Sequence, residues 1–162
     1  MTTVRIGDHL LLVDVEQTKA YYQARAQTLC ECPCCRNYYA LIQSKYPRLE
    51  QFLAQFGVDV SRPDEALSVE MSDWIDYINV DYTVCGTMPD AEEITMERQG
   101  DFDFDVVFFN GFVSPNAQTG EYFTISVSGI DLPWGLDEPF PAPIRFKKES
   151  KLIGLLRRWF GL

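Results

Sequence analysis

The sequence predicts a single α+β domain: an N-terminal hairpin and two or three helices packed on a mainly antiparallel β-sheet, followed by a C-terminal amphipathic helix. From Glu16 to Gly57, apart from the cysteine cluster, the chain holds good helix formers with apolar residues every three to four positions. Beyond Gly57 this spacing shortens towards two, which is typical of strands. No internal repeat or low-complexity linker divides the 162 residues. We therefore expect one domain over residues 1–146 and an amphipathic basic helix over residues 147–162.

The first part of the chain is predicted to form a hairpin and then helices. Thr2–Ile6 and Leu10–Val15 are aliphatic, β-branched runs separated by a Gly-Asp-His turn, a pattern that favours a hairpin. Glu16–Leu29 contains good helix formers and neither glycine nor proline. After the cysteines, a second helix is expected from near Arg36 to about Lys45.

The clearest helix begins at Pro47, because proline suits the first helical turn, and ends before Gly57. Four apolar residues spaced i, i+3, i+4, i+7 form one stripe that we expect to be buried: Leu49, Phe52, Leu53 and Phe56.

Strands are expected to follow Gly57, with alternate residues of the last two strands buried. We predict strands at Leu67–Met71, Ile75–Val84, Asp103–Phe109 and Glu121–Val127 and loops at Pro89–Glu93 and Ser114–Gly120. The proline-rich segment Leu132–Pro143 is expected to form neither a continuous helix nor a central strand.

Charge is distributed unevenly along the chain. Residues 145–162 hold 6 basic residues and 1 acid, whereas residues 1–144 hold 8 basic and 23 acidic residues, within a total net charge of −10. An acidic body of this kind repels phosphate backbones, so we expect no nucleic-acid partner. The sequence contains neither a secretory leader nor a run of about 20 apolar residues that could span a bilayer. We therefore predict a cytoplasmic protein.

The predicted tail helix, residues 147–162, gathers its apolar side chains on one broad side: Leu152, Ile153, Leu155, Leu156, Trp159 and Phe160. Such a helix can be the last helix of the domain, can dock into a groove of a partner protein, or can lie in a membrane interface. If this helix binds outside the domain, we favour a protein partner over peripheral contact with a membrane.

Four of the five cysteines fall within residues 30–35, which read C-E-C-P-C-C, and Cys85 stands alone. Without a secretory leader this pattern does not indicate a disulfide framework. Three interpretations stay open: a structural zinc site, a redox dithiol, and cysteines that pack as small hydrophobic residues.

A zinc site needs four ligands in a tetrahedron, and C-x-x-C spacing lets one tight turn present two sulfurs to the ion. Cys32 and Cys35 have this spacing, and Cys30 adds a third sulfur. The candidates for the fourth ligand are Cys85, Cys34 and His9, among which we predict Cys85.

A redox dithiol is indicated by Cys32 and Cys35, which form a C-P-x-C motif. A helix that begins just after the motif would lower the pKa of a cysteine at its N-terminus. A helix, however, is expected before the motif, where thiol–disulfide oxidoreductases have a core strand.

No motif of a hydrolase, kinase or nucleotide-dependent dehydrogenase occurs in the sequence. We therefore expect a non-enzymatic, cytosolic binding or interaction protein of unidentified partner, with structural zinc held by Cys30, Cys32, Cys35 and Cys85. The alternative is a thiol-dependent redox protein that uses the C-P-x-C dithiol.

Four strings in the chain resemble a group of small bacterial proteins with no assigned activity. They are C-x-C-x-x-C-R-N-Y at residues 30–38, Y-P-x-L together with F-L-x-x-F-G-V-D at residues 46–59, and L-P-W-G-L-D-E-P at residues 132–139. The resemblance implies kinship but no chemistry. It also implies that Cys30, Cys32 and Cys35 are the positions of the group and that Cys34 is additional, which favours zinc over the dithiol.

Overall fold

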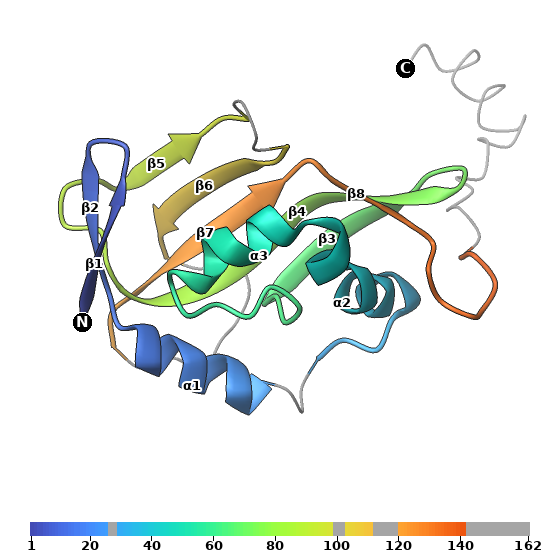
Figure 1. Ribbon diagram of the computed structural model, residues 1–162, viewed down its shortest axis with the longest axis horizontal. Coiled ribbons are helices and arrows are strands. Elements are labelled where there is room, and N and C mark those ends of the chain that lie inside the picture. Colours follow the sequence, from blue (N-terminus) through green and yellow to red (C-terminus); the bar gives the residue numbers. More distant parts are fainter. Residues whose placement is uncertain (26–28, 99–102, 112–119, 142–162) are drawn as a thin grey trace, which may run out of the picture.

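The computed structural model describes residues 1–25, 29–98, 103–111 and 120–141. The predicted tail helix at residues 147–162 lies outside these ranges, as does nearly all of the predicted loop Ser114–Gly120. The described residues form three helices and eight strands (Figure 1). The helices are α1 (Val15–Arg25), α2 (Pro33–Lys45) and α3 (Pro47–Ala54). The strands are β1 (Thr2–Ile6), β2 (His9–Val13), β3 (Glu65–Glu70), β4 (Trp74–Thr87), β5 (Glu93–Met96), β6 (Asp105–Asn110), β7 (Tyr122–Ser128) and β8 (Ile130–Pro133).

The strands build one sheet in the order β1-β2-β4-β7-β6-β5, and β3 and β8 each add to β4. Every described pairing is antiparallel. The 14-residue β4 is the centre of this sheet, since it pairs with β2 and β3 along one edge and with β7 and β8 along the other. The predicted α+β class with a mainly antiparallel sheet is confirmed.

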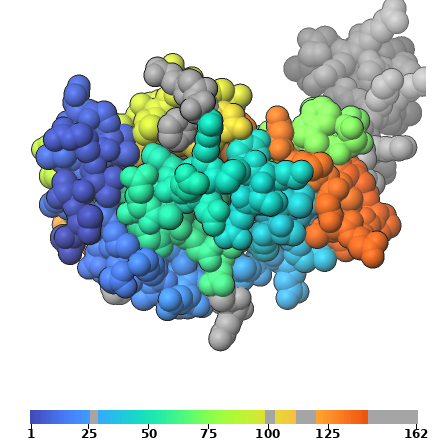
Figure 2. Space-filling view, viewed as in Figure 1, coloured from blue at the N-terminus to red at the C-terminus, as the bar shows by residue number. Residues whose placement is uncertain are grey.

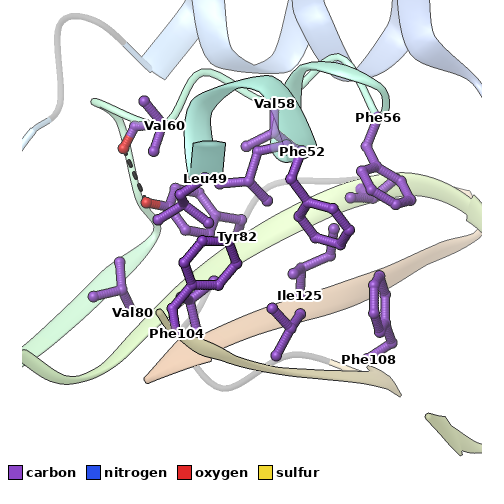
Figure 3. Packing of buried hydrophobic residues seen from close by; sticks show 14 of the residues in the cluster. Leu49, Phe52, Phe56, Val58, Val60, Val80, Tyr82, Phe104, Phe108 and Ile125 are labelled. Atoms are coloured by element: carbon purple, nitrogen blue, oxygen red, sulfur yellow. Dashed lines mark hydrogen bonds between the residues drawn. The ribbon is translucent and has the colours of Figure 1, made fainter. Parts of the chain in front are cut away.

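The core lies between the helices and the sheet. In Figure 3, Phe52 and Phe56 point from the α3 segment towards Phe108 on β6. The centroid of the Phe108 ring lies 6.2 Å from that of Phe52 and 5.8 Å from that of Phe56. These are the separations at which tilted aromatic rings attract one another. The whole predicted stripe of α3 is buried, which confirms the helical spacing: Leu49, Phe52, Leu53 and Phe56.

Buried alternation is also confirmed on the strands that carry the other side of the core. On β6 and just before it the buried side chains are Phe104, Val106 and Phe108, and on β7 they include Phe123, Ile125 and Val127. On β4, the Tyr82 hydroxyl donates a hydrogen bond to the Val60 carbonyl at 2.9 Å (Figure 3). That bond satisfies a polar group that the core would otherwise leave unpaired.

Two features of the fold differ from the sequence-based expectation. The predicted loop Pro89–Glu93 is wrong at its end, because β5 begins at Glu93 and pairs with β6. Of the four β5 residues only Ile94 is buried, so the strand has too few apolar positions to show a period. The second helix begins at Pro33 and not near Arg36, so two cysteines belong to its first turn. The proline-rich segment, by contrast, contributes only the end of the short strand β8, which pairs with β4 alone, so its described residues form neither a continuous helix nor a central strand, as expected.

Candidate metal centre

The cysteine cluster is organised by the start of α2. Cys32 is the N-cap residue, with extended backbone (φ −64°, ψ 152°), and Pro33 occupies the first helical position, where no amide hydrogen is needed. The backbone N–H of Cys35 donates to Cys32 Sγ at 3.4 Å, so a thiol takes the capping role usually filled by a serine or aspartate. The N–H of Arg36 donates to the Cys32 carbonyl at 3.0 Å and closes the first turn.

Cys30 lies in the segment just before the helix, and its sulfur is turned towards the same point. The backbone N–H of Cys32 donates to Cys30 Sγ at 3.5 Å. As a result the Sγ atoms of Cys30, Cys32 and Cys35 all lie within 4.8 Å of one another. Cys30 and Cys32 are exposed, whereas Cys35 is buried.

This geometry fits a thiophilic cation such as zinc. With Zn–S bonds of about 2.3 Å, sulfurs at tetrahedral positions stand about 3.8 Å apart, so the three thiols need to draw together by no more than about 1 Å. Two of the three sulfurs already accept a backbone N–H, a contact that favours the thiolate form over the thiol. Three residues of the predicted zinc set are therefore brought together.

The three thiols differ in how readily they lose a proton. The N–H of Cys32 lowers the pKa of Cys30. Burial, followed by the hydrogen bond and charge of Cys32, raises the pKa of Cys35. Burial, followed by the charge of Cys35 one helical turn away, also raises the pKa of Tyr39. Cys35 is thus the thiol for which a bound cation makes the largest difference, because the cation replaces the solvent that burial removes.

The remaining candidate ligands lie elsewhere. The thiol of Cys34 donates to Glu70 Oε1 on β3 at 3.4 Å, and burial raises its pKa to about 11. Cys85 is a buried residue of β4 that pairs with Tyr122 of β7. Its backbone N–H donates a hydrogen bond to the Thr18 hydroxyl oxygen at 3.0 Å. The structure therefore does not bring Cys85, the fourth ligand predicted from the sequence, to the other three sulfurs.

His9, the only histidine in the sequence, is the first residue of β2 and pairs with Ile6 in the β1–β2 hairpin. Like Cys85, it does not belong to the group of close sulfur atoms. Cys34 stays outside the group for a different reason, since its position in the helix directs its thiol to β3 and the core.

Arg36 joins the cysteine segment to a part of the chain one hundred residues away. Its Nε donates to the Glu31 carbonyl, between the two exposed cysteines, at 3.0 Å. Its Nη2 lies 2.6 Å from Glu138 Oε1, forming an ion pair that is partly open to solvent. One guanidinium therefore holds both the backbone of the cysteine segment and the segment after β8.

Asn37 anchors the same helix from its buried side. Its Nδ2 donates to the Pro133 carbonyl at 3.1 Å, and its Oδ1 accepts the Gly135 N–H at 2.8 Å. The Trp134 indole N–H donates to the Glu138 carbonyl at 2.7 Å, which folds this segment back on itself. Figure 2 shows the orange end of the described chain lying against the side chains of α2.

Sequence reasoning missed three residues that hold the cysteine segment and α2 in place: Arg36, Asn37 and Glu138. All three stand inside the two strings C-x-C-x-x-C-R-N and L-P-W-G-L-D-E-P, which the structure places in contact through the Arg36–Glu138 pair and the Asn37 hydrogen bonds. The joint presence of both strings was thus the available signal for a contact between them.

A second surface feature is an apolar strip on the outer part of the sheet. Leu67 and Val69 of β3, Met71 just after it and Ile78 of β4 are 38–57% exposed. Among the described strands β3 pairs only with β4, so its other edge has no strand partner there.

Comparison with known proteins returned no match to a family model, a curated protein or a solved structure. None of the helices in the described ranges is long and apolar enough to cross a membrane.

Proposed function

We propose that the protein is a non-enzymatic binding protein whose fold at the start of α2 is stabilised by zinc bound to Cys30, Cys32 and Cys35. The observation that carries the proposal is the convergence of three Sγ atoms within 4.8 Å. Thiolates are the ligands that zinc prefers in structural sites, and three of them supply most of the coordination shell.

The role of the metal is to fix the segment before α2. Residues 29–32 carry no helix or strand, and Cys30 and Cys32 are exposed there. The segment is held by hydrogen bonds with Arg36 and by the two N–H···S bonds. Little apolar burial adds to these contacts, because residues 30–32 are exposed. An ion bound to Cys30 and Cys35 at once ties it to the first turn of α2, and binding energy of that kind becomes folding energy.

A cytosolic location and a protein partner belong to the same proposal. All five cysteines are free thiols, as expected in a reducing compartment. The strip of exposed apolar residues on β3 and β4 supports a binding role, because contiguous exposed apolar surface commonly marks an interaction site.

A second candidate, a thiol-dependent redox protein, is favoured by one observation. Cys32 and Cys35 form a C-P-x-C pair at the N-terminus of α2, with the Cys35 N–H donating to Cys32 Sγ. We rank this candidate below zinc because it leaves Cys30, the third member of the cluster, without a role.

The experiment is a competitive zinc titration of the metal-free protein and of matched serine variants. Cys32→Ser and Cys35→Ser each remove one sulfur of the cluster and are expected to weaken zinc binding at least about a hundredfold. Cys34→Ser and Cys85→Ser remove buried thiols outside the cluster and are expected to leave the affinity within about threefold. Equal weakening by all four variants, or no zinc binding by the unmodified protein, would refute the proposal.

Thiol reactivity separates the two candidates. If the cluster is a redox dithiol, Cys32 or Cys35 should react with iodoacetamide as a thiolate well below the ordinary cysteine pKa of about 8.5, and zinc should not protect it. If the cluster binds zinc, one equivalent of the metal should protect all three thiols from alkylation. Peptide mapping by mass spectrometry identifies the modified cysteines.

A further inference from the structure

The chain itself does not provide a fourth sulfur or imidazole for the metal. Its five cysteines and one histidine all lie in the described residues. Three of them form the close group, and the other three lie on β2, on β4 and on the core side of α2. Within the described ranges no carboxylate oxygen joins the group either. Zinc prefers four ligands, and since no described residue supplies the fourth, that position is open to a donor from outside.

The open position faces solvent. Cys30 and Cys32 are exposed, whereas Cys35, the third member of the group, is buried. A metal bound here has its protein ligands behind it and its remaining position directed outward. This is the arrangement of three protein ligands plus one exchangeable ligand that keeps a zinc ion available for binding.

Charge selects the kind of donor. Three thiolates and Zn²⁺ carry a combined charge of −1. Glu31 lies between the two exposed cysteines, and Glu65 acts electrostatically on Cys30. The nearby cation, Arg36, is already engaged by Glu138. A fourth thiolate would bring a further negative charge to this acidic surface, whereas a neutral imidazole nitrogen brings none.

We propose that the zinc site formed by Cys30, Cys32 and Cys35 is completed by the imidazole nitrogen of a histidine donated by another protein molecule, so that the metal is a point of attachment for a partner. This inference rests on the proposed zinc binding and identifies the partner by its chemistry. The donor is either His9 of a second copy or a histidine of a different protein, and the two sources can be distinguished.

The test uses protein loaded with Co²⁺ in place of zinc, since the visible d–d bands of cobalt report its coordination. Imidazole is titrated into the loaded protein, and 2-mercaptoethanol is titrated into a second sample. We expect imidazole to change the d–d bands in a saturable manner with a 1:1 stoichiometry, at least about tenfold more tightly than the thiol at pH 7. The His9→Ala variant is measured in parallel, because it removes the only imidazole of the chain.

A carboxylate-to-amide variant tests the charge argument. Glu31→Gln combined with Glu65→Gln is expected to reduce the preference for imidazole over thiol by at least about threefold, whereas Glu16→Gln, a charge removed from the α1 surface, should leave it unchanged. If the unmodified protein, but not the His9→Ala variant, shows nitrogen ligation and zinc-dependent dimerisation without added imidazole, the donor is a second copy. Monomers in both proteins, with the imidazole response intact, exclude a second copy and leave a different protein as the source of the histidine.

Two results have separate consequences. If Co²⁺ and zinc do not bind, the proposed function fails and this inference fails with it. If they bind but imidazole leaves the d–d bands unchanged, or the thiol binds more tightly than imidazole, the inference alone is overturned and zinc binding stands.

Discussion

Substitution of Asn37 by alanine tests whether the segment after β8 holds α2, the helix that carries the cysteine cluster, in place. The side chain of Asn37 is fully buried and makes hydrogen bonds of 2.8 and 3.1 Å to the backbone of Gly135 and Pro133. Each such bond contributes about 1 kcal/mol net, so their loss costs about 2 kcal/mol. Alanine is the better helix former by about 0.5 kcal/mol, which offsets part of the loss. We therefore expect the free energy of unfolding to fall by about 1.5 kcal/mol.

The assay is urea unfolding of the metal-free protein, followed by tryptophan fluorescence, because Trp134 lies in the segment that Asn37 holds. Gln43→Ala is the matched control on the same helix, since the Gln43 amide bonds to Glu50 at the exposed surface. The control should change the stability by less than about 0.5 kcal/mol. A loss below that value for Asn37→Ala as well would show that the contact between α2 and residues 133–135 does not stabilise the fold as reasoned.

Three further substitutions have defined outcomes. Arg36→Ala breaks a partly exposed ion pair, so the free energy of unfolding should change by no more than about 1 kcal/mol. The zinc affinity should fall at least about tenfold, because Arg36 also holds the backbone of the cysteine segment. An unchanged affinity would contradict this positioning role. Gly57 has φ +79°, and an added Cβ would lie 2.5 Å from the Val15 carbonyl oxygen. Gly57→Ala should therefore destabilise the protein by about 2 kcal/mol or more, measured by thermal unfolding. A neutral effect would be inconsistent with that geometry. Burial raises the pKa of Asp81, so its protonated form favours the folded state, and the stability of the unmodified protein relative to Asp81→Asn should decrease as pH rises above about 4. A difference that does not depend on pH would exclude this titration.

The helices were the most predictable part of the fold, for a local reason. The buried stripe of α3 follows directly from residue spacing; Pro47 marks the start of the helix and Gly57 the turn after its end. The strand β5 was missed because its place in the sheet comes from pairing with β6, and long-range pairing leaves little trace in a four-residue sequence. The start of α2 was displaced because cysteine is not a usual N-cap, yet Cys32 caps this helix through its sulfur.

The candidate metal centre was predictable only where its cysteines are neighbours in sequence. Cys30, Cys32 and Cys35 all lie within residues 30–35, so their spacing in the sequence alone brings the sulfurs together. The predicted fourth ligand required a contact across 50 residues, and the structure instead places Cys85 within the pairing of β4 and β7. Contacts of that range depend on sheet register, which the cysteine pattern does not contain.

The most direct test of the zinc site is elemental analysis of protein purified without added metal. We expect about one zinc ion per chain, lost in Cys32→Ser and kept in Cys85→Ser, and a melting temperature that falls on addition of a chelator. A content below about a tenth of an equivalent, in protein that melts at the same temperature with and without chelator, would contradict the conclusion that these three thiols form a metal site.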